Sequence, residues 1–329
     1  MLFFFILSFQ NFLYLEFEYL LIKMANYVVT GGAGFIGSNI VEELVKRGET
    51  VKVIDDLSTG SRSNLKNVLK DIEFVKGSIT NYALLKKEFA GYDYVLHQAA
   101  EVSVQKSIKH PVNTAKINVL GTINVLKAAK DTGINRVVIA SSCAVYGESP
   151  TAVSENSIVK PLSPYAASKL SAETFSRLYS DLYGLETVCL RYFNVFGPRQ
   201  NPKSEYAAVI PKFLKIVKAR RKPVIYGDGF QTRDFVYVSN VVEANILAAT
   251  KPGVGGNTYN IGTGISTDIN TLVKHVNKVL EKNVTPKYEA ARDGDIKQSK
   301  AHISAAKQGL NYFPKVDLIA GLRKTVEAL

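Results

Sequence analysis

The sequence predicts an α/β fold: a doubly wound parallel sheet with a smaller C-terminal domain interleaved with it. Three observations support this prediction. From residue 26 onward, short β-branched runs alternate with longer amphipathic stretches, which is typical of βαβ units on a parallel sheet. A glycine-rich loop over residues 31–37 joins the first run to the first amphipathic stretch. An acid, Asp55, stands at the end of the second run, at the edge where such sheets bind ligands.

The loop after the first predicted strand, Tyr27–Thr30, has the glycine spacing of a dinucleotide-binding turn. Gly31 permits the tight turn, Gly34 lets the backbone approach a pyrophosphate, and Gly37 allows the following helix to pack closely on the strand. The free N–H groups at the start of that helix favour phosphate. Asp55 is expected to accept hydrogen bonds from ribose hydroxyls and to repel a 2′-phosphate. The pattern therefore predicts a Rossmann domain that binds NAD rather than NADP.

The remaining elements follow the same alternation as far as residue 191. The predicted strands are Tyr27–Thr30, Val51–Asp55, Glu73–Lys76, Tyr94–His97, Arg136–Ala140 and Glu186–Arg191. The predicted helices are Phe35–Arg47, Pro111–Lys130 and Pro164–Tyr183, each followed by a glycine that can end it. After residue 192 the alternation fades, and a basic helix is expected over Pro211–Arg220. We therefore assign residues 24–191 to the Rossmann domain and residues 192–329 mainly to a smaller substrate-binding domain, with segments that return to the first.

The composition is that of a globular protein with a basic surplus. Apolar residues make up 46% of the chain and charged residues 21%, which argues against disorder. Lys and Arg outnumber Asp and Glu by 41 to 29. One basic run consists of Lys212, Lys215, Lys218, Arg220, Arg221 and Lys222. Spaced lysines near a helix end usually form a solvated face, so no nucleic-acid partner is expected. The alternative is a relative that binds nucleotides or RNA without catalysis.

Cysteine and histidine usage argues against disulfides and metals. The two cysteines, Cys143 and Cys189, show no pairing pattern, which fits a reducing cytoplasm. The four histidines show no metal-ligand spacing, so no metal site is expected.

Residues 1–23 form an unusual leader that is rich in Phe and Leu. The leader lacks the basic start and the cleavage site of a secretory signal, and polar residues interrupt any apolar run of about 18 residues. We expect Met24 to be the natural start, the leader to have no folded role, and no stable membrane insertion. A membrane-surface anchor is the alternative.

The segment Ser163–Lys169 places Tyr165 and Lys169 four residues apart on a predicted helix. This spacing puts both side chains on one face of the helix. A tyrosine has a pKa of about 10 and is a poor base at neutral pH, so lowering that pKa by about three units needs roughly 4 kcal/mol of extra stabilisation of the phenolate. A lysine ammonium and a cationic nicotinamide are charges of the kind that could supply it. The pair therefore indicates proton and hydride exchange with an alcohol.

Taken in order, these segments resemble an extended short-chain dehydrogenase/reductase of the NAD-dependent epimerase/dehydratase family, and within it the UDP-hexose 4-epimerases. Besides the glycine loop and the Tyr-x-x-x-Lys pair, the matching segments are 97–100 (HQAA), 141–147 (SSCAVYG), 190–194 (LRYFN), 231–235 (QTRDF) and 292–295 (RDGD). The resemblance extends from residue 26 to the C-terminus.

The resemblance implies inversion at C4 of a UDP-hexose through a 4-keto sugar, with tightly bound NAD. Tyr165 would take the proton of the sugar 4-hydroxyl, Ser142 would hydrogen-bond the same oxygen, and Lys169 would hold the nicotinamide ribose and depress the tyrosine pKa. The implied cofactor-binding residues are Gly31, Gly34, Phe35, Ile36, Gly37, Asp55, Ser78, Ile79, Gln98, Ala99, Ala100, Asn118, Tyr165, Lys169 and Phe193. The implied substrate-binding residues are Ser103, Ser142, Tyr165, Asn194, Val209, Tyr226, Arg233, Arg292, Asp295 and Ser299.

Positions near the implied sugar site narrow the expected reaction. Related dehydratases carry acids just after the catalytic serine, whereas this chain has Cys143 and Ala144, so elimination and decarboxylation are not expected. Ser299 stands where epimerases restricted to non-acetylated sugars tend to have a tyrosine. We therefore expect UDP-Glc/UDP-Gal and also UDP-GlcNAc/UDP-GalNAc as substrates, and a homodimer. Another reductase or dehydratase of the family is the alternative. His302 replaces the usual aspartate, with no predicted role.

Overall fold

The computed structural model describes residues 24–201, 209–291 and 296–328. The expected leader, residues 1–23, lies outside the described residues, and so do the predicted substrate residues Arg292 and Asp295.

The centre of the fold is a sheet of seven parallel strands. Its strands are β1 (Asn26–Thr30), β2 (Thr50–Asp55), β3 (Ile72–Lys76), β4 (Tyr94–His97), β5 (Arg136–Ser142), β6 (Glu186–Tyr192) and β11 (Thr258–Ile261). They lie in the order β3-β2-β1-β4-β5-β6-β11. The chain therefore reverses its direction of travel between β1 and β4, and ligands of such sheets bind at the carboxyl ends of those strands.

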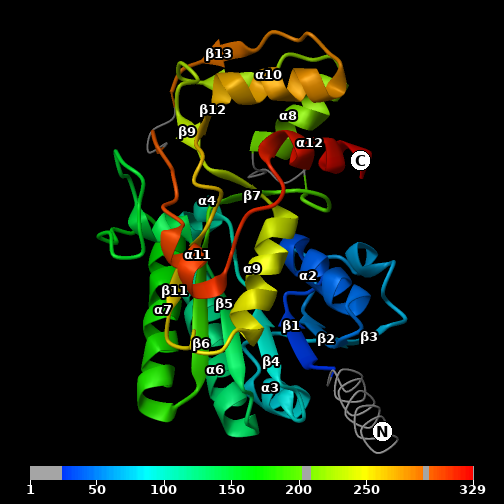
Figure 1. Ribbon diagram of the computed structural model, residues 1–329, viewed down its shortest axis with the longest axis vertical. Coiled ribbons are helices and arrows are strands. Elements are labelled where there is room, and N and C mark those ends of the chain that lie inside the picture. The colour runs from blue at the N-terminus through cyan, green and yellow to red at the C-terminus, as the bar shows by residue number, and fades with distance from the viewer. Residues whose placement is uncertain (1–23, 202–208, 292–295, 329) are drawn as a thin grey trace, which may run out of the picture.

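Helices cover both faces of the sheet (Figure 1). One face carries α2 (Phe35–Lys46) and α9 (Val238–Thr250), and the other carries α3 (Tyr82–Phe89), α6 (Gly121–Thr132) and α7 (Pro164–Tyr183). Alternate residues of a strand enter opposite cores: Val29 packs with the α2 side and Val28 with the α6 side. This confirms the predicted doubly wound Rossmann architecture.

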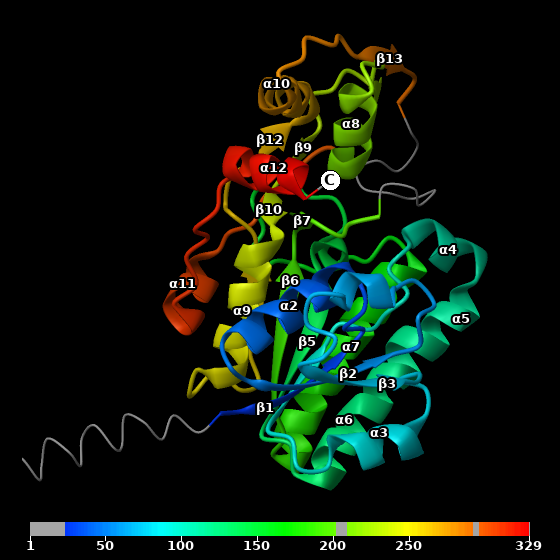
Figure 2. The same ribbon diagram turned by 90° about the vertical axis from the view of Figure 1, so that its right-hand side faces the viewer.

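Most elements from β7 onward form a second layer at the carboxyl end of the sheet (Figures 1 and 2). They include three short strand pairs: β7 (Asn194–Phe196) with β10 (Phe235–Tyr237), β8 (Val224–Tyr226) with β13 (Lys287–Glu289), and β9 (Thr232–Arg233) with β12 (Thr267–Asp268). The helices of this layer are α8 (Val209–Lys218), α10 (Ile269–Leu280) and α12 (Leu318–Glu327), while α11 (Ser304–Leu310) packs beside β11 and α9.

Two features of the helices differ from the sequence-based expectation. The predicted helix Pro111–Lys130 is divided into α5 (Pro111–Ala115), a π-helical turn η2 (Lys116–Leu120) and α6. The predicted basic helix begins earlier, at Val209, and ends at Lys218, because Arg220 takes a positive φ of 56°. No helix within the described ranges is long and apolar enough to cross a membrane.

The elements that were not predicted include helix α3 and strand β11. Helix α3 is short, and strand β11 lies in the part of the chain where the regular alternation has faded. Strand β11 nevertheless pairs in parallel with β6, with Ile261 opposite Tyr192. The C-terminal half of the chain therefore completes the sheet that its N-terminal half begins.

Candidate active site

The glycine loop brings the start of α2 against the sheet. Gly31 has a positive φ of 69°, and its N–H donates to the Ile54 carbonyl at 2.8 Å, which sets the tight turn. A Cβ on Gly37 would lie 2.1 Å from the Gly31 oxygen, and a Cβ on Gly31 would lie 2.6 Å from the Ala99 nitrogen. Within the described residues no side chain caps α2, whose N-cap is Gly34. The N–H groups at this helix end are therefore open to an anionic ligand.

Asp55 is fixed at the end of β2 with its carboxylate against the glycine loop. Oδ2 accepts a hydrogen bond from the Ala33 N–H at 2.9 Å, and Oδ1 accepts one from the Leu57 N–H at 2.7 Å. Burial raises the pKa of the Asp55 carboxyl, and the two backbone hydrogen bonds oppose that rise. Each oxygen keeps a lone pair that can accept a bond from a ribose hydroxyl.

The other predicted cofactor residues at this edge follow β3 and β4: they are Ser78, Ile79, Gln98, Ala99 and Ala100. The Ser78 hydroxyl lies 3.0 Å from that of Thr80, and Ile79 is buried. The side-chain amide of Gln98 donates to Asn245 of α9 at 3.0 Å. The structure thus brings these residues to the same edge as the glycine loop.

Asn118 links the loop after β4 to the helix that carries the catalytic pair. It lies in the π-helical turn, a feature that is frequent at functional sites. Its Nδ2 donates to the Glu101 carbonyl and to the Ser168 hydroxyl, both at 2.9 Å, while its Oδ1 accepts from the Glu101 N–H at 2.8 Å. The Ser168 hydroxyl donates in turn to the Tyr165 carbonyl at 2.7 Å. Asn118 therefore positions the turn of α7 that carries Tyr165.

Tyr165 and Ser142 meet at the carboxyl end of β5. Helix α7 starts at Pro164, with the Ser163 hydroxyl accepting from the Ala166 N–H as a cap, so Tyr165 lies in its first turn. Burial raises the Tyr165 pKa to about 12, although a hydrogen bond with Ser142 lowers it in part. The packing of the chain thus makes the phenol a weaker acid than free tyrosine, and the depressed Tyr165 pKa implied by the resemblance stays a prediction.

Lys169 lies one helical turn beyond Tyr165 and is buried. Its Nζ lies 6.0 Å from the centroid of the Tyr165 ring and donates to the Ala140 carbonyl at 2.7 Å. Burial lowers the Lys169 pKa to about 8, against the raising effect of Cys189 and Glu173. A buried ammonium with so few partners is a feature of functional sites.

A buried ion pair holds α7 on the sheet beneath the catalytic residues. Arg191 of β6 donates from Nε and Nη2 to the two carboxylate oxygens of Glu173, at 2.9 and 2.7 Å. The Ser141 hydroxyl also donates to Glu173, and Arg191 donates to the Tyr146 hydroxyl at 2.8 Å. The bidentate geometry fixes orientation as well as distance. Glu173 was not predicted as a site residue, although it stands four residues after Lys169 and faces the same side of α7.

Two of the predicted substrate residues, Arg233 and Ser299, lie in segments joined by a buried carboxylate, Asp234. Asp234 accepts four bonds: from the N–H and hydroxyl of Thr263 and from the N–H groups of Gly264 and Ala301. These bonds join the segment that carries Arg233 to residues 263–264 and to Ala301, which lies two residues after Ser299. The sequence analysis did not assign Asp234 a role. Its position as an acid within the motif at residues 231–235 was a signal that could have identified it as a site residue.

Ser299 lies beside the residue that follows Ser142. The Ser299 N–H donates to the Thr232 carbonyl at 3.1 Å, which places Ser299 next to Arg233. The Ser299 side chain hydrogen-bonds the thiol of Cys143. Burial raises the Cys143 pKa to about 11, so this thiol stays protonated. The structure therefore connects the catalytic end of β5 to Arg233 and Ser299.

The other predicted substrate residues take different positions. Asn194 donates to the Asp234 carbonyl at 3.3 Å, and the neighbouring cofactor residue Phe193 is buried. Ser103 caps α4 (Val104–Lys109). Val209 begins α8 and Tyr226 ends β8, so both lie in the second layer. Of these residues, Asn194 contacts Asp234, which also accepts a hydrogen bond from Ala301 in the segment of Ser299.

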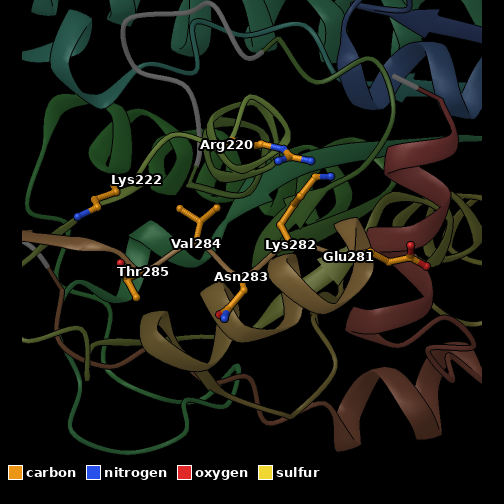
Figure 3. Close-up of a pocket in the computed structure, with 7 residues that line it drawn as sticks. All are labelled: Arg220, Lys222, Glu281, Lys282, Asn283, Val284 and Thr285. Carbon is orange, nitrogen blue, oxygen red and sulfur yellow. The ribbon is translucent and has the colours of Figure 1, made fainter.

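A hollow of about 440 Å³ lies beyond the C-terminal ends of α8 and α10. Its lining includes Arg220 and Lys222 of the basic run, together with Glu281 and Lys282 (Figure 3). Arg220 and Lys282 extend to the same side of the hollow, and Glu281 points away from them (Figure 3). None of the predicted site residues lines this hollow, so the hollow does not define the active site.

The comparison with family models identifies the chain. Residues 27–262 match the model of the NAD dependent epimerase/dehydratase family. The chain belongs to this family. Family membership confirms the resemblance drawn from the motifs, and the family's dependence on NAD confirms the predicted cofactor.

Individual relatives of the family agree in sequence and structure. A putative UDP-glucose 4-epimerase of Methanocaldococcus jannaschii is 40% identical over 302 residues, covering 91% of this chain and 96% of that protein. The structure of a UDP-N-acetylglucosamine 4-epimerase from Methanobrevibacter ruminantium, in complex with UDP-N-acetylmuramic acid, matches with a TM-score of 0.89 and 42% identity over 93% of this chain and 98% of that one. A UDP-glucose 4-epimerase of Thermus thermophilus, in complex with NAD, matches with a TM-score of 0.84 and 36% identity over 92% and 98%.

The family cofactor fits the residues present. The glycine loop forms a cradle that a Cβ at Gly31 or Gly37 would fill, and the uncapped end of α2 faces it. Asp55 is placed to accept bonds from a ribose, and Lys169 offers an ammonium beside Tyr165. In the described part of the chain, no group of three or more His, Cys, Asp or Glu side chains could hold a metal ion.

Proposed function

We propose that this enzyme of the epimerase/dehydratase family is a UDP-hexose 4-epimerase. The observation that carries the proposal is that Ser142 and Tyr165 hydrogen-bond each other beside the buried Lys169, and that neither of the two residues after Ser142 is an acid or a base. The next two residues are Cys143, whose thiol is held protonated by burial, and Ala144. Elimination of water would need a group there that exchanges a proton. Inversion at C4 requires none.

NAD, when bound, would accept a hydride from C4 of the sugar and return it to the opposite face. Tyr165 would take the proton of the 4-hydroxyl during oxidation and return it during reduction, so that the proton count balances over one turnover. Ser142 would hold the same oxygen in place. Lys169 would hold the nicotinamide ribose and, with the cationic cofactor, lower the Tyr165 pKa from the raised value that burial imposes.

The proposed substrates are UDP-glucose and UDP-galactose together with their 2-acetamido counterparts. Arg233 offers a guanidinium for the diphosphate, and we assign the rest of the UDP contacts to Asn194, Val209 and Tyr226, together with Arg292 and Asp295. Ser299 is small and contacts Cys143, which leaves room for an acetamido group. The similarity to a UDP-N-acetylglucosamine 4-epimerase supports this choice.

We further propose that the enzyme is a homodimer in the cytoplasm. Helices α4, α5, η2 and α7 contact one another and carry exposed large apolar residues, which a second copy would cover. These residues are Val104, Ile108, Val112, Leu120, Leu178 and Leu182. Both cysteines are free thiols, as expected in a reducing compartment. The domain division at residue 191 is part of the same proposal.

The experiment is to incubate the purified enzyme with each UDP-sugar without added NADH and to follow the sugar signals by NMR. The expected result is interconversion of the two C4 epimers, with no loss of water and no net oxidation. Tyr165→Phe, which removes one hydroxyl, should lower turnover by about 10²–10⁴-fold while leaving the fold unchanged. A 4-keto product that accumulates, or salt-sensitive RNA binding without turnover, would overturn the proposal.

A further inference from the structure

The carboxyl end of β5 is tied to α7 at three consecutive residues. The ties join Ala140 with Lys169, Ser141 with Glu173, and Ser142 with Tyr165. In the first, the lysine Nζ donates to the backbone carbonyl at 2.7 Å, and in the second, the serine hydroxyl donates to the carboxylate. Because the three partners on α7 are spaced four residues apart, they share one face of the helix. The same face of α7 therefore carries the Tyr-x-x-x-Lys pair and Glu173 against the end of β5.

A second strand also holds Glu173. Arg191 of β6 donates to both oxygens of the carboxylate, at 2.9 and 2.7 Å, and Oε1 accepts from Ser141 as well. All three residues are buried. A bidentate pair fixes orientation as well as distance, so the carboxylate has one position from which it holds the Ser141 hydroxyl. The residue that follows Ser141 in the chain is Ser142, which hydrogen-bonds Tyr165.

The charge of Glu173 also acts on Lys169, one helical turn before it. Burial lowers the Lys169 pKa to about 8, and Cys189 and Glu173 oppose that fall. The groups around this ammonium and its carboxylate are Tyr165 on α7, Cys189 and Arg191 on β6, and His97 on β4. Burial raises the pKa of the phenol and of the thiol to about 12 and lowers the imidazole pKa to about 3, so these three groups are neutral at pH 7. Glu173 therefore supplies the negative charge that stabilises the Lys169 ammonium.

We propose that Glu173 is a positioning residue for the epimerase reaction, because it holds the end of β5 against α7 and keeps an ammonium beside Tyr165. The inference rests on the proposed function, in which Ser142 and Tyr165 share the sugar 4-hydroxyl and Lys169 holds the nicotinamide ribose. Glu173 acts through these residues and not on the substrate itself. Without its charge, Lys169 would lose its proton at a lower pH.

Ser141→Ala tests the positional role, because it removes the hydroxyl that ties β5 to Glu173 and leaves the ion pair with Arg191 in place. We expect kcat for interconversion of UDP-glucose and UDP-galactose to fall by about tenfold, with KM changed by less than about twofold, since a small displacement of a catalytic group costs rate. Thr187→Val is the matched control. The buried Thr187 hydroxyl also ties a strand to α7, by donating to the Ser176 carbonyl at 2.9 Å, but farther along the helix. This control should lower the unfolding temperature as Ser141→Ala does and leave kcat unchanged.

Glu173→Gln tests the electrostatic role. An NMR titration of isotope-labelled lysine side chains gives the pH at which Lys169 loses half of its protons, and Lys169→Met identifies the signal. This midpoint should fall by at least about half a pH unit in Glu173→Gln and stay unchanged in Ser141→Ala. The alkaline limb of the kcat profile should move in the same direction. If Glu173→Gln does not fold because Arg191 is left unpaired, Glu173→Gln/Arg191→Gln removes both charges and should give the same lower midpoint.

Two results would overturn the inference. One is an equal change of kcat in Ser141→Ala and Thr187→Val, or no change in either. The other is an unchanged Lys169 midpoint in the folded variant that lacks the Glu173 charge. Failure of the proposed function is distinguishable, because the wild type would then not interconvert the UDP-sugars, whereas the Lys169 midpoint would still report the effect of Glu173.

Discussion

His97 donates a hydrogen bond of 3.0 Å from Nε2 to the hydroxyl of Thr122. The Thr122 hydroxyl gives its own proton to the Asn118 carbonyl at 2.6 Å, so towards His97 it can only accept. The other ring nitrogen, Nδ1, therefore accepts from the Thr30 hydroxyl at 2.7 Å. A neutral imidazole thus joins the start of the glycine loop to the π-helical turn that carries Asn118.

Replacing His97 should destabilise the fold. In His97→Leu the buried Thr30 hydroxyl loses its partner and the ring leaves unfilled space, so the free energy of unfolding should fall by about 2–4 kcal/mol. His97→Gln retains both a donor and an acceptor and is the matched control, with a smaller loss expected. Urea denaturation measures both variants. Equal losses in the two variants would contradict the role of the hydrogen bonds.

His97 also predicts a pH dependence of stability. Burial lowers its pKa from 6.5 to about 3, so between these values the unfolded chain binds more protons than the folded one. The contribution of His97 to stability is therefore complete above about pH 6.5 and is lost as the pH falls towards 3. Denaturation series for wild type and His97→Gln should converge as the pH falls through this window. A constant difference would show that the imidazole is not held neutral.

We expect replacement of Lys169 to change stability and activity in opposite directions. Burial lowers its pKa from 10.5 to about 8, so a buried charge is held at neutral pH. Lys169→Met should abolish turnover yet raise the free energy of unfolding by about 1–3 kcal/mol at pH 7. Between pH 8 and 10.5 the unfolded wild type holds the extra proton, so wild-type stability should rise with pH and the difference should shrink. A variant that is less stable at pH 7 would refute this account.

We expect that no side chain larger than that of glycine fits at position 37, beside the cofactor loop. In Gly37→Ala the new methyl group would lie 2.1 Å from the Gly31 oxygen, so α2 must move away from the loop. We expect a loss of more than about 2 kcal/mol in stability and loss of NAD retention on purification. Gly91→Ala is the control, since its Cβ meets open space and only its φ of 82° opposes alanine. The control should cost about 1 kcal/mol and retain NAD.

Ser299 predicts substrate selectivity, on the basis of the proposed function. Ser299→Tyr places a ring where the small side chain now meets Cys143. Turnover of UDP-N-acetylglucosamine should fall by more than about tenfold, whereas turnover of UDP-glucose should change little, because the hydroxyl at C2 needs less room. Coupled assays on both substrates measure the ratio. An equal fall for both sugars would mean that the ring disturbs the site generally.

The local features of this protein were readable from its sequence because they depend on neighbouring residues. The spacing of Gly31, Gly34 and Gly37 dictates a turn and a close helix, and the four-residue step from Tyr165 to Lys169 dictates a shared helix face. The same local rules predicted six of the strands and the glycine-capped end of α7 at Gly184. These features depend only on local sequence and not on how distant segments of the chain pack.

The tertiary structure alone decided the relationships between distant segments. Strand β11 joins β6 because the edge of the sheet offers unpaired groups, which a four-residue strand cannot signal by pattern. The bond from Asn118 to Ser168, the pair of Glu173 with Arg191, and the meeting of Cys143 with Ser299 each join residues far apart in sequence. Burial, which raises the Tyr165 pKa and lowers that of Lys169, depends on the whole packed chain, and no local pattern encodes it.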